Sequence, residues 1–237
     1  MHIGCIIQAR LTSKRFPKKI LKKIKKKTIL EIVNERASKI KKVNKVVFAI
    51  PGSKSNEKLA IFLKNKKIEF FKGSEKNVLE RYYETANKYR FDIIMRITSD
   101  CPLIDPYLCN NMLNYFMKNN FDYMSNILER TFPVGLDCEI FTMKALKKTI
   151  KTTKSRFNQE HVTPYMRNPN RFNIKNFYNN HKVEKQRWTL DYPLDLKFIN
   201  KAFEKFNARK KLRWYRLYKL YKKDAKNKKY INQKYII

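Results

Sequence analysis

Glycine, cysteine and histidine are scarce in this chain of 237 residues, which argues against flexible linkers and against Cys- or His-based metal sites. With 4 glycines and 8 prolines, no flexible linker divides the chain, so we predict a single domain over residues 1–237. The four cysteines show no CxxC spacing, and the three histidines complete no metal signature. No apolar run approaches the ~20 residues that span a bilayer, and no signal region opens the chain. These absences predict a soluble protein of the reducing cytoplasm.

Acidic residues are few as well. The chain has 20 Asp and Glu residues against 55 Lys and Arg residues, which gives a formal net charge of +35. Such a charge attracts nucleic acid, anionic lipid or phosphorylated substrates. The basic residues are spread along the whole chain, however, and its wealth of Lys, Asn, Ile and Tyr is what low-GC coding produces. We therefore rank nucleic acid second among the partners.

Short apolar runs alternate with helical patterns through the first hundred residues. The runs predict strands at 3–7, 45–50, 68–71 and 92–97. Apolar residues at helical spacing predict helices at 28–41, 56–66 and 78–89, with Thr28 as the N-cap of the first. This rhythm is typical of a mostly parallel sheet covered on both faces, which binds ligands beyond the carboxyl ends of its strands.

The second half of the chain continues this pattern less regularly. It predicts helices at 106–118, 143–150 and 193–206, strands at 122–127 and 137–141, and a turn at 133–135. Two further runs, at 171–178 and 187–190, indicate edge or returning strands. A helix over 159–166 is expected to end or kink at Pro164.

Residues 207–237 form a basic, aromatic extension that we predict to be helical. Trp214, Leu217 and Tyr218 are interleaved there with Arg213 and Arg216. A helix of this composition lies on an anionic membrane, binds nucleic acid, or docks its aromatic face on the core. We favour the docked helix over the membrane contact.

The first predicted strand leads directly into a cationic loop. The strand stops at Gln8, and Pro17 stiffens the loop that follows. Arg10, Arg15, Lys18 and Lys19 fall within ten residues of each other. Guanidinium and ammonium groups on a loop at the carboxyl end of a strand grip several phosphate oxygens together, so the loop suits a polyphosphate. The alternative is an ordinary basic surface loop.

Two aspartates follow other strand-like runs. Asp100 ends the fourth predicted strand, and Asp191 follows the run at 187–190. A polyphosphate bound by cations also needs Mg²⁺, which is held by one or two carboxylates, so we predict that these two share the sheet edge with the cationic loop. Asp195 is expected to cap the helix that begins beside it.

Six motifs, in order, resemble the cytidylyltransferases that make CMP-activated sugars, especially the branch of spore-coat polysaccharide biosynthesis. They are IIQARLTSKRFPKKIL, FFKGSEKNVLERYYETANKY, MRITSDCPLID, FPVGLDCEIF, QEHVTPYMRN and RWTLDYPLDLKFI. Together they cover nearly the whole chain. The resemblance departs from the family at Lys18, where relatives usually have Gly, and at 50–52, where many have Thr and an acidic residue.

The resemblance implies a three-layer α/β/α fold of the nucleotide-diphospho-sugar-transferase type, Rossmann-like, with a mostly parallel mixed sheet. The implied reaction transfers CMP from CTP to a small sugar or sugar-acid acceptor with release of pyrophosphate, for surface polysaccharide or glycoconjugate synthesis. Mg²⁺ is the implied cofactor. Relatives are often dimers, so the resemblance also implies a homodimer, with no specific nucleic acid as partner.

The resemblance also assigns roles to single residues. It places Arg10, Lys19 and Asp100 at the reacting groups, and Asp100 and Asp191 at the metal. The nucleotide would be bound by Ala9, Arg10, Ser13, Arg15, Lys19, Gly73 and Ser74. The acceptor would lie beside Glu139, Glu160 and His161.

Two other functions stay open at this stage. A glycosyltransferase of similar fold normally carries a DxD metal motif, and Asp100 has no carboxylate two residues away. A basic nucleic-acid-binding protein agrees with the net charge, but no recognised nucleic-acid motif supports it. We rank both below the cytidylyltransferase.

Overall fold

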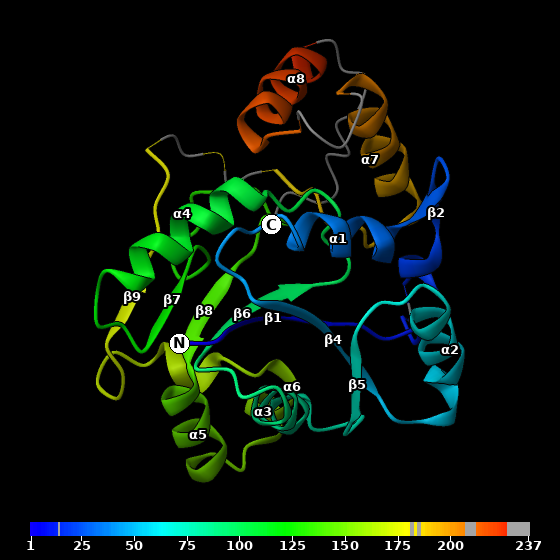
Figure 1. Ribbon diagram of the computed structural model, residues 1–237. Coiled ribbons are helices and arrows are strands. Elements are labelled where there is room, and N and C mark those ends of the chain that lie inside the picture. The colour runs from blue at the N-terminus through cyan, green and yellow to red at the C-terminus, as the bar shows by residue number, and fades with distance from the viewer. Residues whose placement is uncertain (14, 181–182, 184–185, 207–211, 227–237) are drawn as a thin grey trace.

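A twisted sheet with helices on both faces forms the body of the protein in the computed structural model, which describes residues 1–13, 15–180, 183, 186–206 and 212–226 (Figure 1). Its seven strands lie in the order β5-β4-β1-β6-β8-β7-β9. They are β1 (Ile3–Gln8), β4 (Lys45–Pro51), β5 (Phe70–Gly73), β6 (Ile93–Thr98), β7 (Tyr123–Ser125), β8 (Glu139–Thr142) and β9 (Ile174–Asn176). Only β8 runs antiparallel to its neighbours in this sheet. The predicted mostly parallel mixed sheet is confirmed.

The helices divide into two layers because successive side chains of a strand point to opposite faces. One hydrophobic cluster joins Ile3, Cys5 and Ile7 of β1 to α1 (Ile29–Ala37), α2 (Glu57–Asn65), α4 (Pro106–Met117), α7 (Pro193–Lys205) and α8 (Trp214–Lys226). A second cluster joins Ile6 to α3 (Val78–Lys88) and α5 (Met143–Thr152). Near this second layer lie α6 (Arg156–His161) and the short helix η3 (Pro164–Arg167). The predicted three-layer fold is therefore confirmed.

Short elements fill the connection between β1 and α1. They are η1 (Lys19–Leu21) and the two-stranded ribbon of β2 (Lys23–Ile24) and β3 (Lys27–Thr28); η2 (Lys54–Asn56) precedes α2. The predicted N-cap of α1 is confirmed as a capping box, in which the Thr28 hydroxyl accepts from the Glu31 amide at 3.2 Å and the Glu31 carboxylate accepts from the Thr28 amide at 2.8 Å. The helix is shorter than predicted and ends at Ala37.

Two predictions in the second half need correction. The run at 187–190 forms no strand: only a single bridge joins Arg187 to Val134. The backbone turns away after that bridge because the Leu190 amide donates to the carbonyl of Asp100 at 2.9 Å. The predicted helix over 159–166 is two pieces, since α6 ends at His161 and Pro164 begins η3.

The aromatic helix α8 docks on the core. Leu217 is 1% exposed, and Trp214 and Tyr218 pack against the same cluster as α1 and α4. The Trp214 ring lies 5.4 Å from the Phe132 ring, between centroids. The predicted docked helix is confirmed for this part; residues 207–211 and 227–237 of the predicted extension lie outside the described residues. Among the residues that the structure describes, no helix is both long and apolar enough to cross a bilayer.

Candidate active site

A cleft of about 860 Å³ opens at the carboxyl ends of β1 and β6, where the sheet topology brings two loops together. Its lining includes most of the residues predicted to act on a nucleotide. The lining residues are Gln8, Ala9, Arg10, Thr12, Ser13, Arg15, Lys19, Ile20, Val78, Arg81, Thr98, Ser99, Asp100, Glu160, His161 and Asp191.

The cationic loop is folded back on itself after β1. The Leu11 carbonyl accepts from the amides of Ser13 at 3.0 Å and Lys18 at 3.3 Å, and the Leu11 amide donates to Asn56 at 2.9 Å. Lys18 has a φ of 55°, in the left-handed region that favours glycine. The departure from the family at this position therefore leaves the backbone in a glycine-type conformation, and Lys19 follows it into the cleft.

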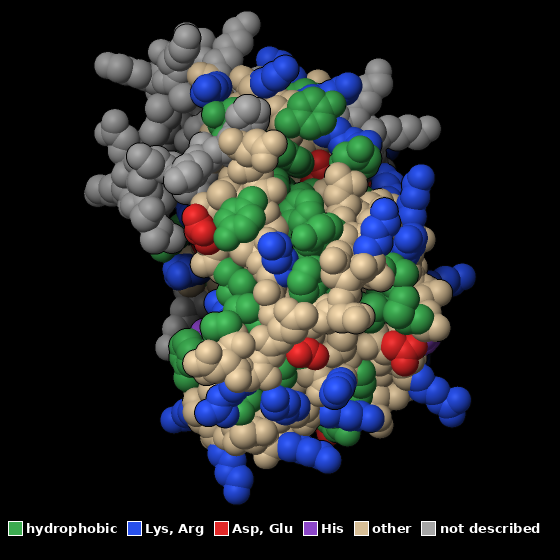
Figure 2. All heavy atoms as spheres, turned by 90° about the vertical axis from the view of Figure 1, so that its left-hand side faces the viewer, with side chains coloured by type: hydrophobic (Ala, Val, Ile, Leu, Met, Phe, Trp, Pro, Cys, Tyr) green, Lys and Arg blue, Asp and Glu red, His purple; other side chains and the backbone are tan. Residues whose placement is uncertain are grey.

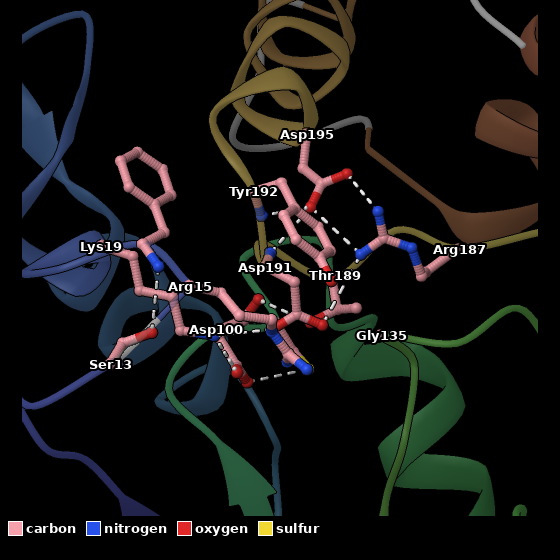
Figure 3. Close-up of polar contacts among 12 residues, drawn as sticks. Ser13, Arg15, Lys19, Asp100, Gly135, Arg187, Thr189, Asp191, Tyr192 and Asp195 are labelled. Carbon is pink, nitrogen blue, oxygen red and sulfur yellow. Dashed lines mark hydrogen bonds and ion pairs between the residues drawn. The ribbon is translucent and has the colours of Figure 1, made fainter. Parts of the chain in front are cut away.

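Lys19 lies between the two aspartates predicted to hold a metal (Figure 3). Its Nζ is 2.7 Å from Oδ2 of Asp100 and 2.9 Å from Oδ1 of Asp191. Arg15 approaches Asp191 from the outer side, with Nη2 at 2.7 Å from Oδ1. The loop of β1 thus supplies cations to carboxylates that come from 81 and 172 residues further along the chain.

The electrostatics of this cluster favour the charged forms of Lys19 and Asp191. Burial acts to raise the pKa of Asp191, but the hydrogen bonds and charges of Lys19 and Arg15 outweigh it and hold that pKa below its ordinary value. Burial likewise acts to lower the pKa of Lys19, and Asp100 and Asp191 together raise it above its ordinary value. Lys19 and Asp191 therefore each stabilise the charged form of the other.

The segment that carries Asp191 is held in place by a second ion pair. Arg187 reaches Asp195 with Nη2 to Oδ1 at 2.5 Å and lies 3.6 Å from Asp191. The Asp195 carboxylate accepts from the amides of Asp191 and Tyr192, each at 2.8 Å, at the start of α7. The predicted capping role of Asp195 is confirmed. The same carboxylate also holds the backbone of Asp191 in place.

Gly135 lets this segment approach the loop before β8. Its φ is 102°, and a Cβ atom there would lie 2.7 Å from the Thr189 nitrogen and from the Trp188 carbonyl carbon. The Trp188 amide donates to the Val134 carbonyl at 2.7 Å. The predicted turn at 133–135 thus seats the backbone that leads to Asp191.

The donor set of the cluster fits a magnesium ion that is shared with substrate phosphates. Mg²⁺ prefers oxygen ligands and is commonly held by one or two carboxylates plus phosphates. Asp100 and Asp191 lie within hydrogen-bonding distance of one nitrogen, so their oxygens converge on a small region. Among the described residues no group of three or more His, Cys, Asp or Glu residues could hold a metal. Asp100 and Asp191 are therefore the two carboxylates that this part of the structure offers to a metal.

The other half of the cleft lies toward α3 and α6. Glu160 and His161 line it as predicted, with the His161 ring 4.7 Å from that of Phe157, between centroids. Arg81 of α3 also lines it, although the sequence analysis did not single it out. The Arg81 side chain is 3% exposed and donates to the Ser74 carbonyl; burial is the main cause that lowers its pKa. The sequence marks Arg81 only as a cation among the apolar residues of the helix predicted at 78–89.

Three predicted site residues lie outside the lining. Gly73 and Ser74 stand behind Arg81, since a Cβ on Gly73 would lie 2.9 Å from the Arg81 side chain. Glu139 is 2% exposed and is engaged by Arg96 and Arg167 rather than facing the cleft. The expectation that Glu139 faces an acceptor therefore receives no support from its position, because the antiparallel pairing of β8 with β6 sets it directly opposite Arg96.

A mostly parallel sheet with a cationic loop and two aspartates at its carboxyl edge defines an α/β protein of the nucleotidyltransferase type. The chain belongs to the cytidylyltransferase family, whose model matches residues 4–234. Protein MJ1063 of Methanocaldococcus jannaschii is 39% identical over 216 residues, 88% of this chain and 87% of that protein.

Two further relatives agree with this assignment. The spore coat polysaccharide biosynthesis protein SpsF of Bacillus subtilis is 28% identical over 222 residues, 86% of this chain and 87% of that protein. The solved structure of a cytidylyltransferase from Leptospira borgpetersenii superposes with a TM-score of 0.90 at 30% identity, covering 95% of this chain and 96% of that one. The family resemblance predicted from the six motifs is confirmed.

Proposed function

We propose that this protein transfers CMP from CTP to a sugar or sugar-acid acceptor, with release of pyrophosphate, for surface polysaccharide or glycoconjugate synthesis. The observation that carries this proposal is the convergence of Lys19 and Arg15 with Asp100 and Asp191 in a chain of the cytidylyltransferase family. The polysaccharide role is supported by the similarity to SpsF.

The chain's own residues would act mainly by positioning. In the reaction the acceptor oxygen bonds to the α-phosphorus of CTP while the bond to pyrophosphate breaks. Arg15 and Lys19 would exchange their carboxylate partners for the triphosphate oxygens, and Arg10 would contact the same oxygens, so that the three cations hold the leaving group in line. Ser13 and the backbone around Ala9 would contact the same phosphates, and Arg81 lies where a further anionic or polar group of the substrate would meet it.

Magnesium dependence is part of the proposal. Asp100 and Asp191 would hold the ion, and the chemistry it would supply is neutralisation of the charge on the phosphate oxygens during transfer.

Glu160 and His161 would face the acceptor from α6. Because CTP is an intracellular nucleotide, the reaction is expected in the cytoplasm. The homodimer that the resemblance implies stays a prediction.

Neither rival function gains a specific observation. Figure 2 shows that the Lys and Arg side chains on one face of the molecule are scattered among hydrophobic and neutral ones. A nucleic-acid-binding surface would instead cluster its basic side chains. A glycosyltransferase would consume a sugar nucleotide instead of making one.

Incubation with CTP, Mg²⁺ and a panel of sugars and sugar acids tests the proposal. Pyrophosphate release that requires both CTP and one acceptor supports it. Consumption of a sugar nucleotide without pyrophosphate release would favour the glycosyltransferase.

A further inference from the structure

The side chain of Gln8 is held at the floor of the cleft by a single defined contact. Gln8 ends β1 and lines the cleft, and its Oε1 accepts from Nη2 of Arg96 at 3.0 Å. A guanidinium group carries donors only, so Arg96 can engage only the oxygen end of an amide. The amide NH₂ of Gln8 is therefore the end left for the cleft, and no hydrogen bond joins it to the part of the chain that the structure describes.

Arg96 is itself fixed from behind. It lies opposite Glu139 in the β6–β8 register, and its Nη1 donates to that carboxylate. Glu139 also accepts from the Tyr123 hydroxyl at 2.5 Å and lies 3.3 Å from Nη2 of Arg167. The Arg96 side chain is 13% exposed and that of Glu139 is 2% exposed, so the pair has little freedom to reorient.

Stability alone is a weak reason for such a group. Replacing a buried ion pair with apolar residues is often neutral or stabilising, because the pair must be desolvated. What this ion pair does provide is direction: it prevents the Gln8 amide from flipping. A cation at the carbonyl end also polarises the amide and makes its NH₂ a stronger donor.

We infer that Gln8 is a specificity-determining residue, whose amide NH₂ donates to an uncharged acceptor atom of a substrate, and that Arg96 is a positioning residue that acts through it. The inference rests on the proposed function, since it takes the cleft to hold CTP and an acceptor. The substrate atom is a carbonyl, ring-nitrogen or hydroxyl acceptor, because the Gln8 amide is an uncharged donor, whereas the charged groups of Arg15 and Lys19 in the same cleft suit phosphates. The nucleoside of CTP and the sugar acceptor both carry such atoms.

The test uses Gln8→Met, which removes the donor without adding charge, and Gln8→Glu, which keeps the contact with Arg96 but replaces NH₂ by an oxygen. Gln159→Glu on α6 is the matched control, because Gln159 does not line the cleft. Calorimetry with CTP reports on the nucleoside, and the KM of the sugar that the wild type uses best reports on the acceptor. Inorganic tripolyphosphate reports on the phosphates alone.

The loss of one neutral hydrogen bond predicts that Gln8→Met weakens one of the two substrates roughly 3- to 10-fold, and that Gln8→Glu weakens it further. A weaker Kd for CTP with unchanged tripolyphosphate binding assigns the contact to the nucleoside. Unchanged CTP binding with a raised KM for the sugar assigns it to the acceptor. If neither constant changes in either variant, the inference is wrong, whereas a wild type that neither binds CTP nor releases pyrophosphate would instead overturn the proposed function.

A double-mutant cycle tests the role of Arg96. Arg96→Met leaves Glu139 paired with Arg167 and Tyr123, and thermal unfolding shows whether the variant folds. If Arg96 acts through Gln8, Arg96→Met weakens the same substrate constant in the wild type but changes it less than twofold in the Gln8→Met background. Equal losses in both backgrounds would contradict a positioning role.

Discussion

The ammonium nitrogen of Lys19 lies 2.7 Å from a carboxylate oxygen of Asp100, and this pair joins the loop after β1 to the loop after β6. The same nitrogen reaches Asp191 at 2.9 Å. The cations that suit a triphosphate thus neutralise the carboxylates that suit a metal. Binding of CTP and Mg²⁺ would exchange both sets of partners together.

Asp100→Asn is expected to lower Mg²⁺-dependent turnover at least about 100-fold, because it removes a charged ligand from the site where phosphate charge is neutralised. The fold should remain, since an Asn still accepts from Lys19. Pyrophosphate release and thermal unfolding are the measurements, and Asp92→Asn, far from the cleft at the start of β6, is the control. Wild-type turnover in the Asp100 variant would show that the metal assignment is wrong.

Gly135→Ala is expected to lower the free energy of unfolding by about 1–3 kcal/mol, because a residue with a side chain is strained at a φ of 102° and its Cβ would press on the backbone of Trp188 and Thr189. Urea denaturation measures this change. Gly52→Ala is the matched control, because the nearest atom to its Cβ is at 3.5 Å, an ordinary contact. Equal stability of the two variants would contradict the account of how Asp191 is seated.

Lys18→Gly is expected to stabilise the protein by about 0.5–1 kcal/mol or leave its stability unchanged. Glycine removes the strain of a left-handed backbone at this position, but its greater conformational freedom in the unfolded chain offsets part or all of that gain. Lys18→Val should destabilise it by about 1–2 kcal/mol, since a β-branched residue tolerates that conformation poorly. Both variants remove the charge of Lys18. If they bind CTP equally well, any loss of CTP affinity relative to the wild type is due to the missing charge and not to the backbone conformation. A Lys18→Val variant as stable as the wild type would refute the strained conformation.

Glu139 predicts a loss of stability in acid. Burial acts to raise its pKa, but Arg96 and Arg167 hold it below the ordinary value of 4.5. A carboxylate with a depressed pKa in the folded state stabilises the fold fully above its unfolded pKa, and this contribution is lost as the pH falls through the folded value. Urea midpoints should therefore fall steadily below pH 4.5.

Glu139→Gln should flatten that acid dependence and cost about 3–5 kcal/mol at neutral pH, because it leaves the largely buried Arg96 and the partly exposed Arg167 without their counter-ion. Glu84→Gln, an exposed carboxylate on α3, serves as the control. An acid dependence that is the same in wild type and Glu139→Gln would contradict the assignment.

Much of the fold was predictable because local patterns and tertiary packing agree. The alternation of apolar strands and amphipathic helices predicted the parallel half of the sheet, and Thr28 marked a helix start by its capping chemistry. The strand predicted at 187–190 was wrong because this run is buried against the turn at Gly135 and does not pair as a strand in the sheet. Apolar composition alone does not distinguish these causes.

The candidate site was predictable only where residues follow strand ends. Arg15 and Lys19 lie on the loop that follows β1, and Asp100 lies just after β6, so parallel topology places them at one edge. The position of Glu139 depends on the register of an antiparallel strand, which the sequence did not reveal. Gln8 was passed over as a strand terminus because its role depends on Arg96, 88 residues away.

The central claim is that Lys19 and its neighbours bind the triphosphate of CTP. Calorimetric titration of CTP with Mg²⁺ into the wild type and Lys19→Met tests it most directly, with thermal unfolding to verify that both are folded. A charge-assisted hydrogen bond predicts saturable binding to the wild type and an affinity roughly 10- to 100-fold lower in the variant. Failure of the folded wild type to bind CTP, or equal affinity in Lys19→Met, would contradict the claim.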